Sequence, residues 1–222
     1  NPSWANHQAI FEAAGFRVRD YRYYDEASQG LDGEGFMADL EGVAEGDIVI
    51  LHACCHNPSG IDLDQAAWEA IATQAKAKNV VCLVDFAYQG FGEGLEEDRA
   101  GLHILLNAGL SVLVVSSYSK NFSLYGERIG AITVVEETAN DAFNAFSHVQ
   151  AAIRAIYSSP PAHGGKIVAT ILGNGPLKAL WMQELAEMRS RIKAMRQAFV
   201  QGMTDRQQVV NFDFINHQKG MF

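Results

Sequence analysis

The chain lacks the features that mark a membrane-spanning or nucleic-acid-binding protein. None of its apolar runs approaches the roughly 20 residues that a membrane-spanning helix needs. It carries 17 Lys and Arg against 26 Asp and Glu, a formal net charge of −9, and its basic residues form no cluster. Because nucleic acids and anionic membrane surfaces repel an acidic chain, we expect neither as its main partner.

Cysteine is scarce, and its three copies form no regular framework. Cys54, Cys55 and Cys82 lie in or beside apolar runs. An odd count without regular spacing indicates reduced, buried thiols of a cytoplasmic protein. His52 and His56 flank the paired cysteines, but no second CxxC or HxxxH pair completes a zinc ligand set, and adjacent strand residues point to opposite faces. We therefore expect no metal site.

Glycine-rich nucleotide-binding loops are also missing. No Walker-type phosphate loop is present, and the Gly-Phe-Gly-Glu-Gly sequence at residues 90–94 does not have the spacing of a dinucleotide-binding fingerprint. The acidic residues in and after this segment have the composition of a solvated loop: Glu93, Glu96, Glu97 and Asp98.

What the chain does have is a globular composition and short apolar runs separated by helical patterns. Hydrophobic residues make up 48% and charged residues 19%, enough for a substantial core in a chain of 222 residues. Strands are predicted at residues 48–51, 80–84 and 112–115, with helices at 64–78 and 100–107 between them. This alternation is typical of an α/β fold with a mostly parallel sheet and helices on both faces.

The remaining patterns complete the expected architecture. We predict a short helix at residues 6–14 with Asn6 as its N-cap, a loose strand at 16–23 and an irregular acidic stretch after it. A strand at 131–135 follows its neighbour too closely for a helical crossover, so it should be antiparallel. Asp64 should cap the helix at 64–78.

One long helix is expected near the C-terminal end. Apolar residues repeat at three and four from Leu177 to Phe199, and Pro176 suits the first turn. A helix of this length indicates a link between domains. We therefore divide the chain into a large domain at residues 1–175, a linking helix at 176–202 and the start of a small domain at 203–222.

Polar side chains follow three of the predicted strands at the point where each strand ends. His52 and Asn57 follow the first, Asp85 and Tyr88 the second, and Lys120 the third. Ligands in a parallel α/β sheet bind beyond the carboxyl ends of the strands. One edge of the sheet should therefore gather an amide, a carboxylate, a phenol, hydroxyls and a lysine.

Lys120 and Asp85 carry the chemistry of this edge. Burial lowers the pKa of a lysine, which makes Lys120 a candidate Schiff-base nucleophile. Asp85 follows four apolar residues and must be paired, either as a cap or against a cationic ring nitrogen. Pyridoxal phosphate needs a lysine at its aldehyde, a carboxylate at its pyridine nitrogen, and hydroxyl and cationic groups at its phosphate. Lys120, Asp85, Ser117 and Arg128 supply that set.

Five motifs in order then resemble a known family. They are Asn-Pro-Ser-Trp-x-Asn-His at 1–7, His-Asn-Pro-Ser-Gly at 56–60, Asp-Phe-Ala-Tyr-Gln-Gly at 85–90, Ser-Tyr-Ser-Lys-Asn-Phe-Ser-Leu-Tyr-Gly-Glu-Arg at 117–128 and Tyr-Ser-Ser-Pro-Pro at 157–161. The chain resembles the class I, fold-type I aminotransferases that use pyridoxal phosphate, in the aspartate and aromatic amino-acid branch. The resemblance implies the family's seven-stranded type of large domain, here incomplete.

The resemblance implies a role for each matching residue. Lys120 would bind the cofactor's aldehyde and then move a proton between the substrate Cα and the cofactor's C4′. Asp85 would pair with the pyridinium nitrogen, with His7 supporting it from behind. His52, like His7, is interpreted from the sequence as a hydrogen-bonded supporting residue and not as a catalytic base. Further cofactor contacts would come from the phenolic-oxygen partners Asn57 and Tyr88, the ring-stacking Trp4, and the phosphate ligands Ser117 and Arg128.

Substrate binding is implied for Asn57, Trp4 and Arg154. In the family an arginine before the Tyr-Ser-x-Pro-Pro segment reaches into the partner subunit's site and binds the substrate's side-chain carboxylate. Here that arginine is Arg154, which implies a homodimer and favours a dicarboxylic substrate, because guanidinium and carboxylate pair bidentately.

Some parts of the family pattern are missing. Position 5 is Ala where the family commonly has Pro. The family's phosphate-binding glycine turn and a partner-subunit tyrosine would precede Asn1, and its α-carboxylate arginine would follow Phe222. We interpret the chain as an internal segment of a longer protein, and expect that it does not transaminate efficiently by itself.

The predicted activity is a ping-pong transfer of the amino group of L-aspartate or an aromatic amino acid to 2-oxoglutarate. Two alternatives stay open at this point. One is another pyridoxal-phosphate reaction on the same fold, such as β-decarboxylation or β-lyase chemistry. The other is a catalytically incomplete fragment that only forms dimers.

Overall fold

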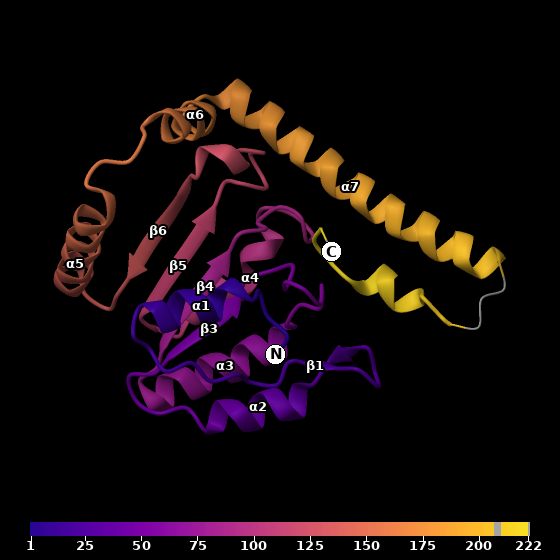
Figure 1. Cartoon of the computed structure of the whole chain (residues 1–222), viewed down its shortest axis with the longest axis horizontal. Helices are drawn as coiled ribbons and strands as arrows, with labels where there is room; N and C mark the ends of the chain where they lie inside the picture. Colours follow the sequence, from indigo (N-terminus) through magenta and orange to yellow (C-terminus); the bar gives the residue numbers. More distant parts are fainter. Residues whose placement is uncertain (207–209, 222) are drawn as a thin grey trace.

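The computed structural model, which describes residues 1–206 and 210–221, is built around a four-stranded sheet (Figure 1). Its strands are adjacent in chain order: β3 (Ile48–His52), β4 (Val81–Phe86), β5 (Val112–Ser117) and β6 (Gly130–Val135). The first three are parallel, and β6 is antiparallel to β5, as its short connection predicted. A separate antiparallel pair is formed by β1 (Tyr24–Asp25) and β2 (Gly30–Leu31).

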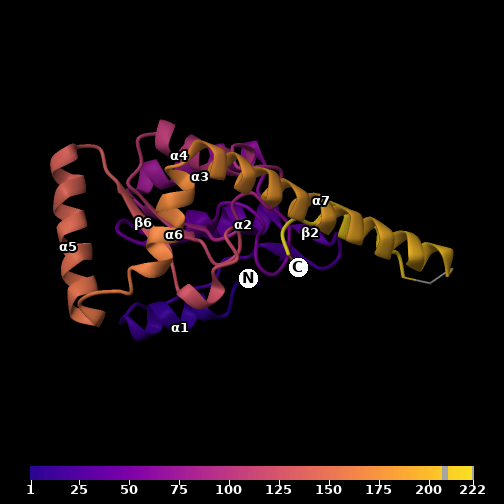
Figure 2. The ribbon, with the colours of Figure 1, turned by 90° about the horizontal axis from the view of Figure 1, so that it is seen from above.

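Helices lie on both faces of the sheet but cover them unequally. On one face lie α3 (Gln65–Lys78) and α4 (Ala100–Asn107), with α2 (Gly33–Glu41) beside α3; α1 (Asn6–Ala13) lies on the opposite face (Figures 1 and 2). Val115 and Ile132, paired across β5 and β6, are each 38% exposed. The predicted α/β fold, with a mostly parallel sheet and helices on both faces, is therefore confirmed.

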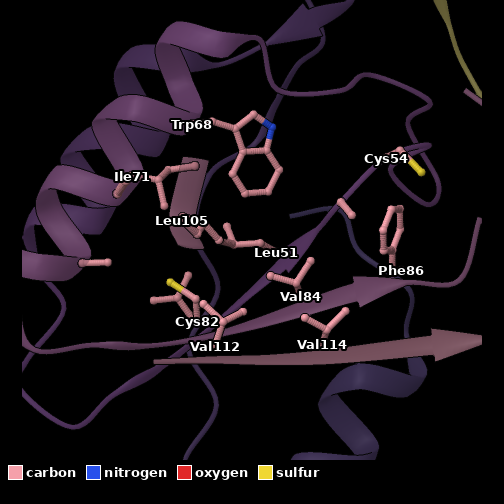
Figure 3. Packing of buried hydrophobic residues seen from close by; sticks show 14 of the residues in the cluster. Leu51, Cys54, Trp68, Ile71, Cys82, Val84, Phe86, Leu105, Val112 and Val114 are labelled. Atoms are coloured by element: carbon pink, nitrogen blue, oxygen red, sulfur yellow. The ribbon is translucent and has the colours of Figure 1, made fainter. Parts of the chain in front are cut away.

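The core lies between the strands and α3 and α4 (Figure 3). Leu51, Val84 and Val112 come from three neighbouring strands and are at most 1% exposed. Trp68 of α3 packs over them at 4% exposure. Gly101 lets α4 approach this ring, because a Cβ there would lie 2.1 Å from the Trp68 side chain. The three cysteines are free and buried, as expected.

Several helices begin and end where the sequence predicted. In α3 the Asp64 carboxylate accepts the N–H of Ala67 at 2.8 Å, and Asn79 ends the helix with a left-handed φ of 51°. The predicted apolar stripe of α3 is buried: Trp68, Ile71, Ala72 and Ala75. α4 matches its predicted bounds. α7 (Gly175–Asp205) is 31 residues long, with Asn174 as its cap and Pro176 in its first turn.

Residues 16–23 do not form the predicted strand. The alternation in this segment arises from Tyr21 and Tyr23, whose hydroxyls donate to the carbonyls of Ile50 and Ile61 at 2.7 Å each. The backbone N–H of Arg22 donates to the Asp39 carboxylate at 2.7 Å and not to a neighbouring strand. The pattern therefore reflects side-chain burial without strand pairing. The N-cap position of α1 is also Ala5 and not Asn6, and it makes no side-chain cap bond.

Three helices lie where the sequence analysis predicted none. α2 falls within the stretch interpreted as irregular, and α5 (Ala139–Tyr157) and α6 (His163–Leu172) follow β6. α5 contains no buried residue, so its sequence is not under pressure to repeat apolar residues along one fully buried face. Its N-cap is Thr138, whose side chain accepts the N–H of Asp141 at 3.1 Å.

After α7 the chain returns along the helix (Figure 1) through a short 3-10 helix, η3 (Asp213–His217). The segment at 203–222, predicted as the start of a small domain, falls partly outside the described residues, and the division into domains stays a prediction. Among the helices that the structure describes, none is both long and apolar enough to cross a bilayer.

Leu105 of α4 is fully buried in the core, at 0% exposure. We expect Leu105→Ala to lower the free energy of unfolding by about 2–5 kcal/mol, because the mutation removes buried apolar area and leaves a cavity. His103→Ala, at an exposed position of the same helix, should change it by less than about 0.5 kcal/mol. Urea unfolding of both variants measures the difference, and equal losses would contradict the assigned core.

Candidate active site

The strand register brings the predicted polar residues to one edge of the sheet. His52 pairs with Asp85, and Asp85 with Val115, so β3, β4 and β5 end side by side. Asn57 lies in the loop after β3, and Lys120 lies just beyond β5. Side chains from three separate segments of the chain are thereby gathered at the carboxyl ends of the parallel strands.

The Asp85 carboxylate is the half-buried anion of this edge. His7 Nε2 lies 2.9 Å from one of its oxygens, and the backbone N–H of Ala87 donates to the other at 3.0 Å. Burial alone would raise the pKa of Asp85, but the His7 hydrogen bond, the nearby imidazole of His52 and the Ala87 N–H together lower it. Asp85 is therefore ionised at neutral pH.

A chain of hydrogen bonds supports this carboxylate. The backbone N–H of Asn57 donates to His52 Nδ1 at 3.4 Å, which leaves the proton of a neutral His52 on Nε2. His52 Nε2 lies 3.3 Å from Ser3 Oγ, and Ser3 Oγ lies 3.2 Å from His7 Nδ1. If each group donates to the next, His7 presents an Nε2–H to Asp85. We call this set the histidine relay: Asn57, His52, Ser3, His7 and Asp85.

Lys120 is half-buried beside Tyr88, with Nζ 4.8 Å from the centre of the Tyr88 ring. Burial lowers the pKa of Lys120, as expected; nearby Asp85 opposes the shift and Arg128 adds to it. Burial and the charge of Asp85 raise the pKa of Tyr88. Asn57 Nδ2 donates to the Tyr88 hydroxyl at 3.4 Å. The amide, the phenol and the amine thus lie next to one another.

The remaining predicted cofactor residues lie at the margin of this cluster. The Ser117 hydroxyl accepts the backbone N–H two residues later at 3.2 Å. Arg128 is exposed, with its guanidinium donating to the Tyr125 carbonyl at 2.8 Å. Trp4 is 44% exposed and packs edge-on against His7, with 5.2 Å between ring centres.

Arg154 is not brought into the cluster. It lies exposed on α5, which is positioned beyond β6 at the far side of the sheet from β3 (Figure 1). Within residues 1–206 and 210–221, no hydrogen bond or ion pair joins Arg154 to Lys120 or Asp85. In this structure the predicted substrate residue Arg154 therefore lies apart from the other site residues.

The acidic residues at 93–98 do not form a uniformly solvated loop. Glu96 and Glu97 are exposed, whereas Asp98 is only 7% exposed. The Asp98 carboxylate accepts the backbone N–H groups of residues 90, 92, 93 and 94. The prediction is therefore wrong for Asp98, because composition does not reveal that the glycine backbone folds around this one carboxylate.

Sequence reasoning missed two residues that organise the site, Ser3 and Asp98. Ser3 lies in the motif at residues 1–7. Nothing in that motif indicates that the Ser3 hydroxyl lies between the imidazoles of His7 and His52. A signal for Asp98 was present in Gly90, Gly92 and Gly94, because glycine N–H groups in a loop need an acceptor when they are buried.

The arrangement has a definite chemical capacity. A buried carboxylate can hold a proton on a heteroaromatic nitrogen, and an amine with a lowered pKa can attack an aldehyde. A guanidinium and a hydroxyl can bind a phosphate. Among the residues that the structure describes, no group of three His, Cys, Asp or Glu side chains could hold a metal ion.

His52 supplies a pH test of the relay. Burial lowers its pKa from 6.5 to about 4, so between these values the unfolded chain binds a proton that the folded chain does not. The free energy of unfolding should therefore rise with pH across this window, with about 3 kcal/mol of the rise due to His52. His52→Gln should flatten the rise by that amount in urea titrations. Exposed His163→Gln is the control for loss of an imidazole, and an unchanged slope in His52→Gln would contradict a buried, neutral His52.

The whole chain is similar to known aminotransferases. It is 48% identical over 222 residues to an aspartate aminotransferase of Pseudomonas aeruginosa and covers 56% of that protein. It is 45% identical over 222 residues to an aromatic-amino-acid aminotransferase of Escherichia coli, again covering 56% of the relative. The chain thus spans about 56% of the length of the curated relatives it matches.

Solved structures give the same result. A crystal structure of an aromatic-amino-acid aminotransferase from Burkholderia pseudomallei, described as covalently bound to pyridoxal phosphate, superposes with a TM-score of 0.97 at 47% identity. The match covers 99% of this chain and 55% of that one. The family model described as "Aminotransferase class I and II" matches residues 1–222. The chain therefore belongs to the class I and II aminotransferase family.

Proposed function

We propose that the chain supplies the cofactor-binding part of a pyridoxal-phosphate-dependent aminotransferase that transfers amino groups from L-aspartate or aromatic amino acids to 2-oxoglutarate. The observation that carries this proposal is that an ionised Asp85 and a Lys120 of lowered pKa lie at the same edge of the sheet. The relatives named aspartate and aromatic-amino-acid aminotransferases support it.

The donor set fits pyridoxal phosphate. The cofactor supplies, when bound, an electron sink for the bond broken at the substrate Cα. Asp85 holds the proton on the ring nitrogen that this sink requires. Lys120 would be the residue that holds the cofactor through its aldehyde, and its amine, once free, would be the base that accepts a proton from the substrate Cα and returns it.

The neighbouring residues bind and orient the cofactor. Asn57 and Tyr88, already in contact, would be the hydrogen-bond donors for the cofactor's phenolic oxygen. Trp4 would pack against the cofactor ring, and Ser117 and Arg128 would hold its phosphate. His7 and His52 act through the histidine relay to keep Asp85 charged.

The assembly proposed is a homodimer in which Arg154 of one protomer completes the site of the other. Arg154 is exposed on a helix without a buried residue, which leaves α5 accessible to a second copy. A cytoplasmic location is part of the proposal, because a relative from Dictyostelium discoideum is named a cytoplasmic aspartate aminotransferase. β-Decarboxylase and β-lyase activities are not favoured, since the named relatives are aminotransferases.

The first test is borohydride reduction of the full-length protein after incubation with pyridoxal phosphate, followed by peptide mass mapping. We expect a pyridoxyl adduct on Lys120, because burial leaves its amine more readily deprotonated than that of an exposed lysine. A Lys120→Arg variant is the control and should carry no adduct there. A wild-type adduct on another lysine, or none, would disprove the assignment.

The role of Arg154 is tested by substrate choice. We expect Arg154→Ala to lower kcat/KM for aspartate on the order of 100-fold, since a charge-assisted bidentate contact is lost, and to change that for phenylalanine only a few-fold. Arg191→Ala, at an exposed position of α7, is the matched control. An equal loss for both amino acids would argue against a carboxylate-binding role.

A further inference from the structure

A buried carboxylate outside the proposed catalytic set organises the loop that follows Tyr88. Asp98 Oδ2 accepts the N–H groups of Gly90 at 2.7 Å and Gly92 at 3.1 Å. Its Oδ1 accepts those of Glu93 at 2.8 Å and Gly94 at 3.4 Å. The loop backbone thus surrounds one negative charge with four donors, as in an anion-binding nest.

The glycines of this loop allow the close approach. A Cβ at Gly92 would lie 2.4 Å from Asp98 Oδ1, inside the closest contact that two such atoms tolerate. Gly90 has a φ of +95°, and a Cβ there would lie 2.3 Å from the Leu185 side chain of α7. The sequence of residues 90–94 is therefore suited to closing around a carboxylate and packing against α7.

The same loop contacts both the segment that carries Tyr88 and the segment that carries Lys120. At its start, the Tyr88 carbonyl accepts the N–H of Phe91 at 3.0 Å. Asn121, which directly follows Lys120, donates from Nδ2 to the Gln89 carbonyl at 3.2 Å. A displacement of residues 89–94 would therefore move Tyr88 directly and the Lys120 segment through Asn121.

α7 holds this junction from the other side. Arg189 donates to the Gly90 carbonyl at 2.7 Å, and Trp181 Nε1 donates to the Asn121 carbonyl at 2.7 Å. The loop and the Lys120 segment thus rest on the same helix. Asp98 accepts hydrogen bonds from the N–H groups of the loop, and Arg189 of α7 donates one to a loop carbonyl.

We propose that Asp98 is a positioning residue for the transamination reaction: by binding the backbone of residues 90–94, it sets the placement of Tyr88 and, through Gln89 and Asn121, that of Lys120. This proposal rests on the proposed function above. Asp98 acts only through these residues and does not itself contact the substrate or cofactor.

Asp98→Asn is the most informative substitution, because it keeps the shape of the side chain. An asparagine retains one acceptor oxygen, but its NH₂ group would face two backbone N–H donors that now lack an acceptor. The loop must then shift on that side. Glu97→Gln is the matched control, since it removes the same charge from the adjacent, exposed position.

The experiment measures full-length protein loaded with pyridoxal phosphate. One readout is the pH midpoint of the absorbance change of the bound cofactor, which responds to the distance between Tyr88 and the phenolic oxygen. We expect Asp98→Asn to move this midpoint by about half a pH unit or more and to lower kcat about tenfold or more. Glu97→Gln should match the wild type in both.

A double-mutant cycle separates positioning from general destabilisation. If Asp98 acts through Tyr88, then Asp98→Asn should have a smaller effect on the midpoint in a Tyr88→Phe background than in the wild type. Equal, additive effects in the two backgrounds would overturn the proposal. So would a folded Asp98→Asn protein with the wild-type midpoint and kcat.

Gly92→Ala provides a second route if Asp98→Asn does not fold. Its methyl group would push against the Asp98 carboxylate without removing the charge. It should move the midpoint in the same way, and an unchanged midpoint would overturn the proposal. Failure of the proposed function is distinguishable: wild-type protein without a Lys120 adduct would overturn both, whereas an adduct with unaltered variants would overturn only the role of Asp98.

Discussion

The hydrogen bond from His7 to Asp85 is the interaction on which the proposed chemistry depends. Asp85 lies at the end of a buried strand, where desolvation favours a neutral carboxyl group. His7 comes from α1, on the sheet face opposite α3 and α4. Without a donor at this position, the carboxylate would be less able to hold a proton on a pyridine nitrogen, and Lys120 would lose a nearby negative charge.

The fold supports this interaction at several levels. Parallel pairing of β3, β4 and β5 fixes the edge at which His52, Asp85 and Lys120 meet. The core under these strands includes the buried side chains of Trp68 and Leu105, so the edge rests on a packed layer. The half-covered opposite face receives α1, which brings Ser3 and His7 to β3 and β4. The packing of the core, the register of the strands and the position of α1 therefore all place groups around the Asp85 carboxylate.

Local patterns allowed much of this to be predicted. Strands with continuous apolar runs, the Asp64 cap and the three strand-end clusters could be recognised because each depends on neighbouring residues. The histidine relay could not be traced fully, because Ser3 joins imidazoles from segments far apart in the sequence. The burial of Asp98 could not be predicted either, because its hydrogen-bond donors are backbone N–H groups, which composition does not show. The segment at 16–23 resembled a strand because tyrosine burial imitates strand alternation.

Nitrogen NMR of histidine-labelled protein tests the central claim most directly, with His52→Gln used to assign the resonances. The account predicts that His52 is neutral at neutral pH, protonated on Nε2 and accepting on Nδ1 from the Asn57 N–H. This tautomer lets Ser3 and His7 direct a donor at Asp85. A charged His52, or one protonated on Nδ1, would contradict the relay and the means by which Asp85 is kept ionised.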